Sequence, residues 1–156
     1  MKKHLTVLTG ASRGMGLVMA EQLCHADQWV LYISRGQSDA LTATADKHGA
    51  HLVQWQADLA QPTTVAEKLS HWLDALHPEE FASATLINNA GVIARIEPLS
   101  ASDPAELAQA LRVGLEAPLL LAAAFLRATE SWRLPRKLLN ISSGLGRRAM
   151  ASQAAY

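Results

Sequence analysis

The stretch TGASRGMG, residues 9–16, follows the apolar run HLTVLT at residues 4–9 and precedes a segment in which apolar side chains recur with helical spacing. A glycine-rich turn between a strand and a helix lets the backbone approach a pyrophosphate, and the helix N-terminus offers unpaired N–H groups to the anion. The spacing is T-G-x-x-x-G-x-G, and tight turns also need glycine for steric reasons alone. We interpret the stretch as a nucleotide-binding turn, with a purely structural turn as the alternative.

Strand-like and helix-like segments alternate along the rest of the chain. Such alternation predicts an α/β fold with a doubly wound parallel sheet whose helices cover both faces. No linker, repeat or low-complexity stretch divides the chain, so we expect one domain over residues 1–156. The predicted strands are 4–9, 29–34, 51–57, 84–89 and 137–142, and the predicted helices are 15–26, 38–48, 62–77 and 105–130.

Capping residues predict where some helices begin and bend. Ser38 is a candidate N-cap for the second helix, because a serine side chain can accept a hydrogen bond from the first turn. Ser102 and Pro104 are interpreted as the cap and an early position of the last helix. Gly114 or Pro118 predicts a bend within that helix.

Composition excludes several classes of function. The net charge is +0, so neither a nucleic-acid nor a membrane surface is expected as a partner. Cys24 is the only cysteine, and the six histidines form no ligand cluster, so we predict no disulfide and no metal site. The N-terminal apolar run is interrupted too early for a signal peptide, and no uninterrupted apolar run reaches about 18 residues. We therefore expect a cytoplasmic protein.

Further motifs follow the later predicted strands in order. They are Asp58-Leu59, Asn88-Asn89-Ala90-Gly91 and Asn140-Ile141-Ser142-Ser143, and the chain ends on Tyr156. Together with TGASRGMG, this series resembles the short-chain dehydrogenase/reductase family, and within it the sepiapterin- or benzil-reductase-like members. The resemblance implies a Rossmann-type sheet, a nicotinamide cofactor and reversible reduction of a carbonyl group.

The resemblance also implies which residues bind the cofactor. The family counterpart of Asp58 contacts the adenine amino group, although Asp58 could instead only cap its loop. Asn88 could be structural rather than ligand-binding, since a buried amide needs partners in any case. The residues assigned to cofactor binding are Gly10, Ser12, Arg13, Gly14, Met15, Gly16, Arg35, Asp58, Leu59, Asn89, Ala90 and Gly91.

The choice between NAD and NADP can be argued from charge. An acidic residue about twenty positions after the glycine turn binds the ribose 2′-OH of NAD, whereas arginine accommodates the 2′-phosphate of NADP. The second predicted strand ends Ile33-Ser34-Arg35-Gly36 without an acid, and Arg13 lies inside the glycine turn. The planar fork of arginine suits phosphate oxygens, although either arginine alone could be a solvated loop charge. We predict NADP(H).

Ser143 and Tyr156 are the predicted catalytic residues. Ser143 lies thirteen residues before Tyr156, which is the family spacing. In the family, the tyrosine donates the proton to the developing alkoxide, and the serine hydroxyl holds the substrate carbonyl. Taken alone, the serine would be read as a turn residue and the tyrosine as a half-buried aromatic.

Two features depart from the family pattern. The lysine that follows the family tyrosine by four residues would lie beyond residue 156, as would a further helix, strands and the substrate loop. We therefore expect an exposed edge on the fifth strand and an uncovered apolar face on the 105–130 helix. In addition, Gly114 stands where the family has an asparagine on this helix, which places the family's proton-relay water in question.

These expectations combine into one function. We predict an NADPH-dependent reductase acting on a small-molecule ketone or aldehyde, forming a homo-oligomer at full length. The alternative is a catalytically inactive NADP-binding fragment or a regulatory remnant. The substrate-determining loop is expected past residue 156, so the sequence does not specify the substrate.

Overall fold

The computed structural model describes residues 2–155, which build a five-stranded sheet with the order β3-β2-β1-β4-β5. All four strand pairs are parallel. The order reverses between β1 and β4, which is the switch point of a doubly wound sheet. The strands are β1 (Lys3–Thr9), β2 (Gln28–Ser34), β3 (His51–Gln56), β4 (Phe81–Asn88) and β5 (Arg136–Asn140).

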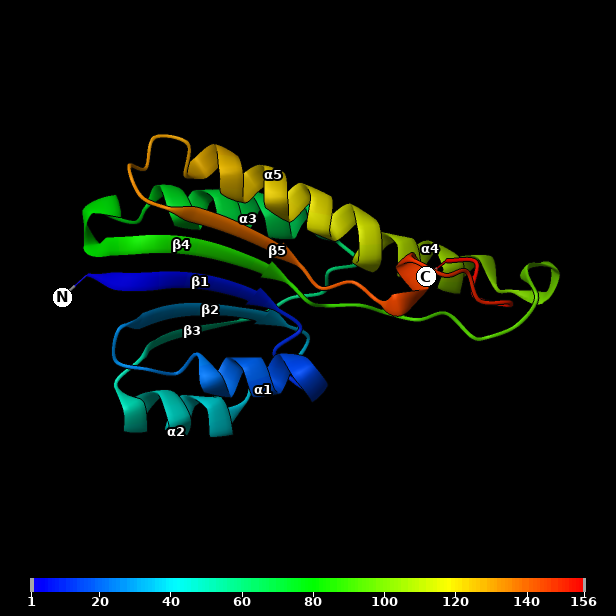
Figure 1. Ribbon diagram of the computed structural model, residues 1–156, viewed down its shortest axis with the longest axis horizontal. Coiled ribbons are helices and arrows are strands. Elements are labelled where there is room, and N and C mark those ends of the chain that lie inside the picture. The colour runs from blue at the N-terminus through cyan, green and yellow to red at the C-terminus, as the bar shows by residue number, and fades with distance from the viewer. Residues whose placement is uncertain (1, 156) are drawn as a thin grey trace.

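Helices cover both faces of this sheet (Figure 1). The helices α1 (Gly14–Gln22) and α2 (Asp39–His48) lie on one face, and α3 (Pro62–Asp74) and α5 (Ala117–Ala128) lie on the other. The short helix α4 (Pro104–Leu111) extends away from the sheet toward the C-terminal segment. The predicted doubly wound α/β fold is therefore confirmed.

Each face of the sheet has its own apolar core. The larger cluster includes Leu5, Leu69 and Phe125, and joins the sheet to α3 and α5. The smaller cluster includes Leu8 and Tyr32, and joins the sheet to α1 and α2. Because β1 and β2 are buried on both sides, their near-continuous apolar sequences are those expected of central parallel strands.

Several predicted boundaries need correction, among them the ends of α3, at Asp74 rather than residue 77, and of β5, at Asn140 rather than residue 142. Helix α1 ends at Gln22 rather than residue 26, and β4 begins at Phe81 rather than residue 84. The cap of α4 is Asp103, whose carboxylate accepts from the Ala105 N–H at 2.8 Å. Ser102 was the wrong cap, because proline favours the first helical position and so the residue immediately before Pro104 becomes the N-cap. The predicted Ser38 cap is confirmed, since its hydroxyl accepts from the Leu41 N–H.

Where a bend was expected, at Gly114 or Pro118, the helix contains a π-helical turn. Residues Arg112–Glu116 form a π-helical turn between α4 and α5, in which the Ala117 N–H bonds to the carbonyl of Arg112. Pro118 has no N–H, so it cannot donate the next helical hydrogen bond. The acceptor would be the Gly114 carbonyl in an α-helix or the Val113 carbonyl in a π-helix. Single π turns inside helices recur at functional sites, and this one borders a cavity described below.

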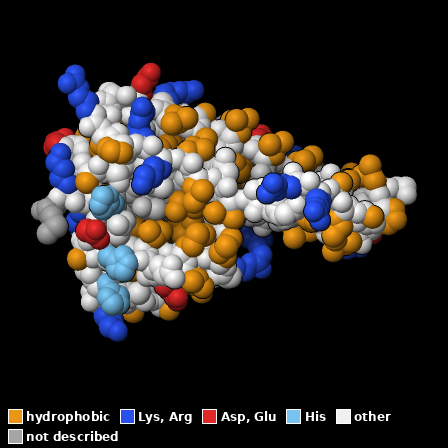
Figure 2. Space-filling model, in the orientation of Figure 1, with side chains coloured by type: hydrophobic (Ala, Val, Ile, Leu, Met, Phe, Trp, Pro, Cys, Tyr) orange, Lys and Arg blue, Asp and Glu red, His pale blue; other side chains and the backbone are white. Residues whose placement is uncertain are grey.

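Apolar side chains are exposed at the edge of the sheet that β5 forms. All five residues of β5 are exposed, as expected for an edge strand that pairs on one side only, and hydrophobic groups gather on this side of the surface (Figure 2). The expected uncovered helix face is also present. Its exposed side chains are Leu111, Leu115, Leu119 and Leu126.

The continuous helix from Pro104 to Ala128 is long and apolar enough, by length and composition alone, to cross a membrane. A core helix of a globular fold meets the same criterion, and α5 buries Leu121 and Phe125 against the sheet and α3. The absence of a membrane partner stays a prediction.

Candidate functional site

A cavity of about 310 Å³ opens at the carboxyl ends of β1 to β4, beside the switch point of the sheet. Ligands of doubly wound sheets bind at this place, because the turns after the strands diverge there. The structure brings to this one cavity every residue that the sequence assigned to cofactor binding, and their roles in binding stay predictions. These lining residues are Gly10, Ser12, Arg13, Gly14, Met15, Gly16, Arg35, Asp58, Leu59, Asn89, Ala90 and Gly91.

The glycine turn is held in place by the segment that follows β4. The side-chain amide of Asn89 donates to the carbonyl oxygen of Thr9 at 3.0 Å. In the other direction, the hydroxyl oxygen of Thr9 accepts from the backbone N–H groups of Asn89 and Ala90, both at 3.0 Å. Thr9 is 1% exposed. Two motifs about eighty residues apart therefore form one hydrogen-bonded unit.

This unit requires glycine at Gly10 and Gly16, where two backbone segments approach each other closely. A Cβ on Gly10 would come within 2.9 Å of the Ala90 Cα, and a Cβ on Gly16 would overlap the carbonyl oxygen of Gly10. The first turn of α1 has no side-chain cap and no acidic residue, unlike α2 and α4. Its N–H groups and the positive end of its dipole are thus free to face an anion.

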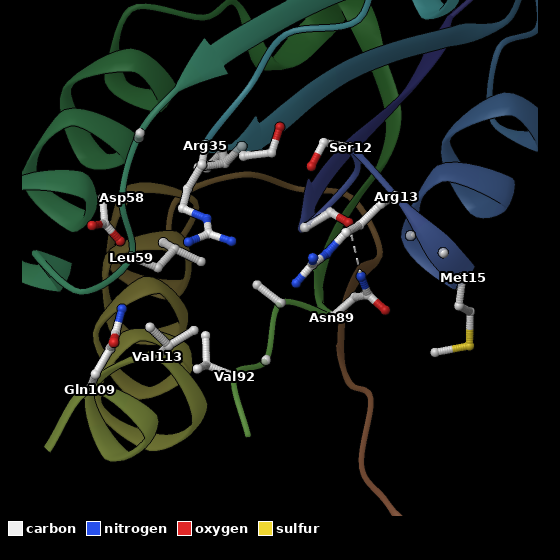
Figure 3. Close-up of a pocket in the computed structure, with 18 residues that line it drawn as sticks. Ser12, Arg13, Met15, Arg35, Asp58, Leu59, Asn89, Val92, Gln109 and Val113 are labelled. Atoms are coloured by element: carbon white, nitrogen blue, oxygen red, sulfur yellow. Dashed lines mark hydrogen bonds between the residues drawn. The ribbon is translucent and has the colours of Figure 1, made fainter. Parts of the chain in front are cut away.

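Two guanidinium groups point into the cavity (Figure 3). Arg13 precedes α1 and Arg35 follows β2, and both side chains belong to exposed residues that line the cavity. Neither takes part in an ion pair within residues 2–155. No carboxylate follows β2 at the position where it would bind a ribose hydroxyl. The cavity therefore carries unneutralised positive charge near the ends of β1 and β2.

Asp58 shapes its own loop and also lines the cavity. One carboxylate oxygen accepts from the Ala60 N–H at 2.9 Å, which is the capping role considered above. The second oxygen has no hydrogen bond within the described chain. The backbone N–H of Leu59 likewise has no acceptor among residues 2–155. The second Asp58 oxygen, an acceptor, and the Leu59 N–H, a donor, are therefore both available to a ligand after β3.

Some lining residues were missed by the sequence analysis. Gln109 and Val113 come from the helix that follows the β4 loop, four residues apart and hence on one helix face. That spacing was a usable signal, although only packing shows which face meets the cavity. The missed residues are Ile33, Ser34, Ala57, Val92, Gln109 and Val113.

A second cavity, of about 560 Å³, adjoins the first and shares five lining residues with it, from Met15 to Val92. Ser142 and Ser143 line it from the segment after β5. The Ser143 hydroxyl accepts from the Leu145 N–H at 3.2 Å and so caps a short 3-10 turn. Ala154 and Ala155 also line this cavity, whereas Tyr156 lies outside the described residues.

Gly114 faces this second cavity from the π turn. A Cβ built on it would meet nothing within 4 Å, so its lack of a side chain leaves open space there. Asn88 has a structural position instead, because its amide donates to the Asn140 side chain at 2.9 Å and thereby joins β4 to β5. Asn88 lines neither of the two cavities.

Comparison with known proteins identifies the family. A family profile described as "short chain dehydrogenase" matches residues 4–156. The chain belongs to the short-chain dehydrogenase family. This confirms the resemblance drawn from the motifs, and the family is one of oxidoreductases that bind a nicotinamide cofactor.

Two curated relatives match the subgroup suggested by the sequence. A benzil reductase ((S)-benzoin forming) of Bacillus cereus is 27% identical over 150 residues, which are 96% of this chain and 60% of the relative. A sepiapterin reductase of Bos taurus is 32% identical over 151 residues, which are 90% of this chain and 57% of the relative. The chain thus spans about 60% of the length of the curated relatives it matches.

Two solved structures share the fold, and the match covers a larger share of their chains than of the curated relatives. A short-chain dehydrogenase/reductase from Burkholderia vietnamiensis has a TM-score of 0.87 and 35% identity, covering 99% of this chain and 69% of its own. A metagenomic short-chain oxidoreductase in complex with NADP has a TM-score of 0.84 and 30% identity, covering 99% of this chain and 68% of its own.

The described residues fit a dinucleotide. The uncapped first turn of α1 suits a pyrophosphate, the two unpaired guanidinium groups suit a phosphate, and the unpaired groups at Asp58 and Leu59 suit a base edge. The cavity continues into the one lined by Ser143, so a ligand could extend from the first cavity to the second.

Proposed function

We propose that this protein takes part in NADPH-dependent reduction of a ketone or aldehyde to an alcohol. The observation that carries the proposal is the continuity of the two cavities. The residues predicted to bind the cofactor line the first, Ser143 lines the second, and the two cavities share wall residues. A cofactor bound in the first cavity would reach a substrate held in the second.

Positive charge supports NADP(H) over NAD(H). Arg13 and Arg35 have no carboxylate partner within residues 2–155, so a 2′-phosphate would supply their missing counter-charge. A solved relative binds NADP. We propose that Arg35 forms the principal contact with the 2′-phosphate and that Arg13 assists it across the cavity.

The chemistry requires a hydride, a proton and stabilisation of developing negative charge. The nicotinamide cofactor supplies the hydride when bound. Ser143 donates a hydrogen bond to the carbonyl oxygen and stabilises the alkoxide that forms. Tyr156, which lies outside the described residues, is proposed to donate the proton to that oxygen.

The lining of the second cavity points to an uncharged substrate. None of its described wall residues is Asp, Glu, Lys or Arg, and most are apolar. A carboxylate or phosphate on the substrate would lose its hydration there without gaining a charged partner. Two relatives are named for reduction of benzil and of sepiapterin. We propose a neutral carbonyl compound with an apolar or ring substituent.

The alternative is a protein that binds NADP without catalysis. It is favoured by the exposed β5 edge. On this reading the first cavity binds the cofactor, and the second does not hold a substrate productively.

Binding and turnover measured on the same preparation separate the two. NADPH and NADH titrations give the dissociation constants, and NADPH oxidation is then followed over a panel of neutral ketones, diketones and carboxylate-bearing ketones. Turnover of neutral substrates that Tyr156→Phe abolishes supports the reductase. Tight NADPH binding without turnover supports the alternative, and equal affinity for NADPH and NADH contradicts the proposed cofactor preference.

A further inference from the structure

We propose that Gln109 recognises the adenine base of the bound dinucleotide, accepting a hydrogen bond from the 6-amino group and donating one to ring nitrogen N7. This inference rests on the proposed function, since it requires NADP(H) in the first cavity. It adds a base-reading residue from helix α4 to those supplied by the strand ends.

The position of Gln109 supports the proposal. Gln109 is half-buried on α4 and lines the cavity together with Val113, one helical turn further on. Its amide lies on the same side of the cavity as Asp58 and Leu59 (Figure 3). No hydrogen bond within residues 2–155 engages this amide, although the neighbouring Glu106 on the same helix is fully engaged with Arg95. The donor and the acceptor of Gln109 are therefore both available to a ligand.

The groups beside Gln109 explain why a second contact to the base is needed. The unpaired carboxylate oxygen of Asp58 can accept one hydrogen of the 6-amino group, and the Leu59 N–H can donate to ring nitrogen N1. That leaves the other amino hydrogen and N7 without partners. A carboxamide pairs with these two adenine atoms at once, with its oxygen on the amino group and its nitrogen on N7.

Apolar neighbours strengthen such a contact. Leu59 and Val113 are buried, at 6% and 5% exposed, and they supply apolar walls in the part of the cavity where the base would lie. A flat ring bound there excludes water from the Gln109 amide. Hydrogen bonds with limited access to water contribute more to affinity, and leaving one unmade costs more.

The test compares two ligands and two variants. The ligands are 2′,5′-ADP, which is the adenine half of NADP, and its 7-deazaadenine analogue, in which N7 is replaced by a carbon. The variants are Gln109→Leu, which removes both hydrogen-bonding groups, and Gln109→Glu, which keeps only acceptors. Gln61→Leu is the matched control, because Gln61 is exposed at the same end of the sheet without lining the cavity. Dissociation constants are measured by calorimetry, and NADPH is titrated alongside.

We expect Gln109→Leu to weaken 2′,5′-ADP and NADPH binding about tenfold, since one bidentate pair is lost. The 7-deaza analogue should bind the wild type several-fold more weakly than 2′,5′-ADP, and this difference should vanish in Gln109→Leu. Gln109→Glu should also weaken 2′,5′-ADP, because a carboxylate cannot donate to N7. Gln61→Leu should match the wild type for both ligands.

The failure of this inference can be told apart from failure of the proposed function. Wild-type binding of NADPH with no effect of Gln109→Leu, or an equal loss for both ligands in that variant, overturns the role of Gln109 alone. A wild-type protein that binds neither NADPH nor 2′,5′-ADP overturns both.

Discussion

The side-chain amide of Asn89 donates to the carbonyl oxygen of Thr9 across 3.0 Å, and the Thr9 hydroxyl oxygen accepts the backbone N–H of Asn89 at the same distance. This reciprocal pair fixes the glycine turn after β1 against the segment after β4. The relative position of the two motifs is therefore set by side-chain hydrogen bonding as well as by strand pairing.

Asn89→Ala should loosen the glycine turn. The substitution removes the amide that bonds to the carbonyls of Thr9 and Gly10, so the free energy of unfolding should fall by about 1–3 kcal/mol. NADPH affinity should fall as well, because the backbone proposed to face the pyrophosphate is then held less firmly. Urea denaturation and calorimetric titration check the two effects. Asn89→Asp is the matched variant, and a wild-type-like stability for it would contradict the assigned donor role.

Gly16→Ala and Gly14→Ala should differ in their effects. An added Cβ at Gly16 would overlap the carbonyl oxygen of Gly10, so the turn must shift and the unfolding free energy should fall by about 1–3 kcal/mol. At Gly14 an added Cβ meets nothing within 4 Å, and its φ of +55° should cost only about 1 kcal/mol.

Gly14→Ala should affect NADPH binding more than it affects the stability of the fold. Gly14 lines the cavity and a Cβ there would meet no protein atom within 4 Å, so Gly14→Ala should weaken NADPH binding more than its small loss of stability explains. Thermal melts with and without NADPH make the comparison. Equal ligand-induced shifts in Tm for Gly14→Ala and the wild type would argue against a cofactor lying over this glycine.

It could be predicted that the candidate site residues lie together, because a parallel sheet brings the carboxyl ends of its strands to one edge. Arg35 and Asp58 are far from the glycine turn in sequence, yet each lies within two residues of the end of a strand, so the fold places both at one cavity. The cap at Asp103 was also available, since Pro104 marks the first helical position and the N-cap precedes it.

Other features depend on packing that no local pattern specifies. The π turn around Gly114 requires a shift of the helical hydrogen bonds by one residue, whereas the sequence indicated only that the ladder is weak there. The side of α4 that meets the cavity follows from how α4 and α5 pack, and so Gln109 was not predicted. The place of Tyr156 lies outside the described residues.

Arg35→Ser should reduce the preference for NADPH over NADH. The side chain is exposed and without an ion-pair partner within residues 2–155, so its removal should leave stability nearly unchanged while NADPH affinity falls about tenfold. NADH affinity should change little, since NADH has no 2′-phosphate. Fluorescence titrations with both cofactors measure the ratio. A parallel loss for both would show that Arg35 does not act on the 2′-phosphate.

Ser143→Ala should lower turnover far more than Ser142→Ala. Both serines line the second cavity, and Ser143 is the one assigned to the carbonyl oxygen. Loss of one such donor typically lowers kcat by about 10²–10³-fold. The NADPH dissociation constant should be unchanged in both variants, since neither serine lines the first cavity. Ser143→Thr keeps the hydroxyl and should recover part of kcat, and the reverse ranking of the two alanine variants would transfer the role to Ser142.

Because His51 resists protonation in the folded state, the free energy of unfolding should fall in mild acid. His51 is an exposed residue, but partial desolvation of its ring, which lies 3.9 Å from that of Trp29, lowers its pKa below the usual value of 6.5, with a smaller contribution from the positive charge of Lys3. As the pH falls through about 6.5, the unfolded chain takes up the proton that the folded chain resists. The unfolded state then binds more protons, so stability is retained above this pH and declines below it until the folded state is protonated too.

The decline should be reduced in two variants for different reasons. His51→Gln removes the titrating group, and Lys3→Gln removes the charge that helps to lower its pKa, so the stability of each should vary less with pH than that of the wild type between pH 7 and 5. The effect of Lys3→Gln should be the smaller one, because desolvation is the larger cause of the shift. Urea midpoints across this range measure both. A wild-type pH dependence in His51→Gln would assign the acid sensitivity to another group.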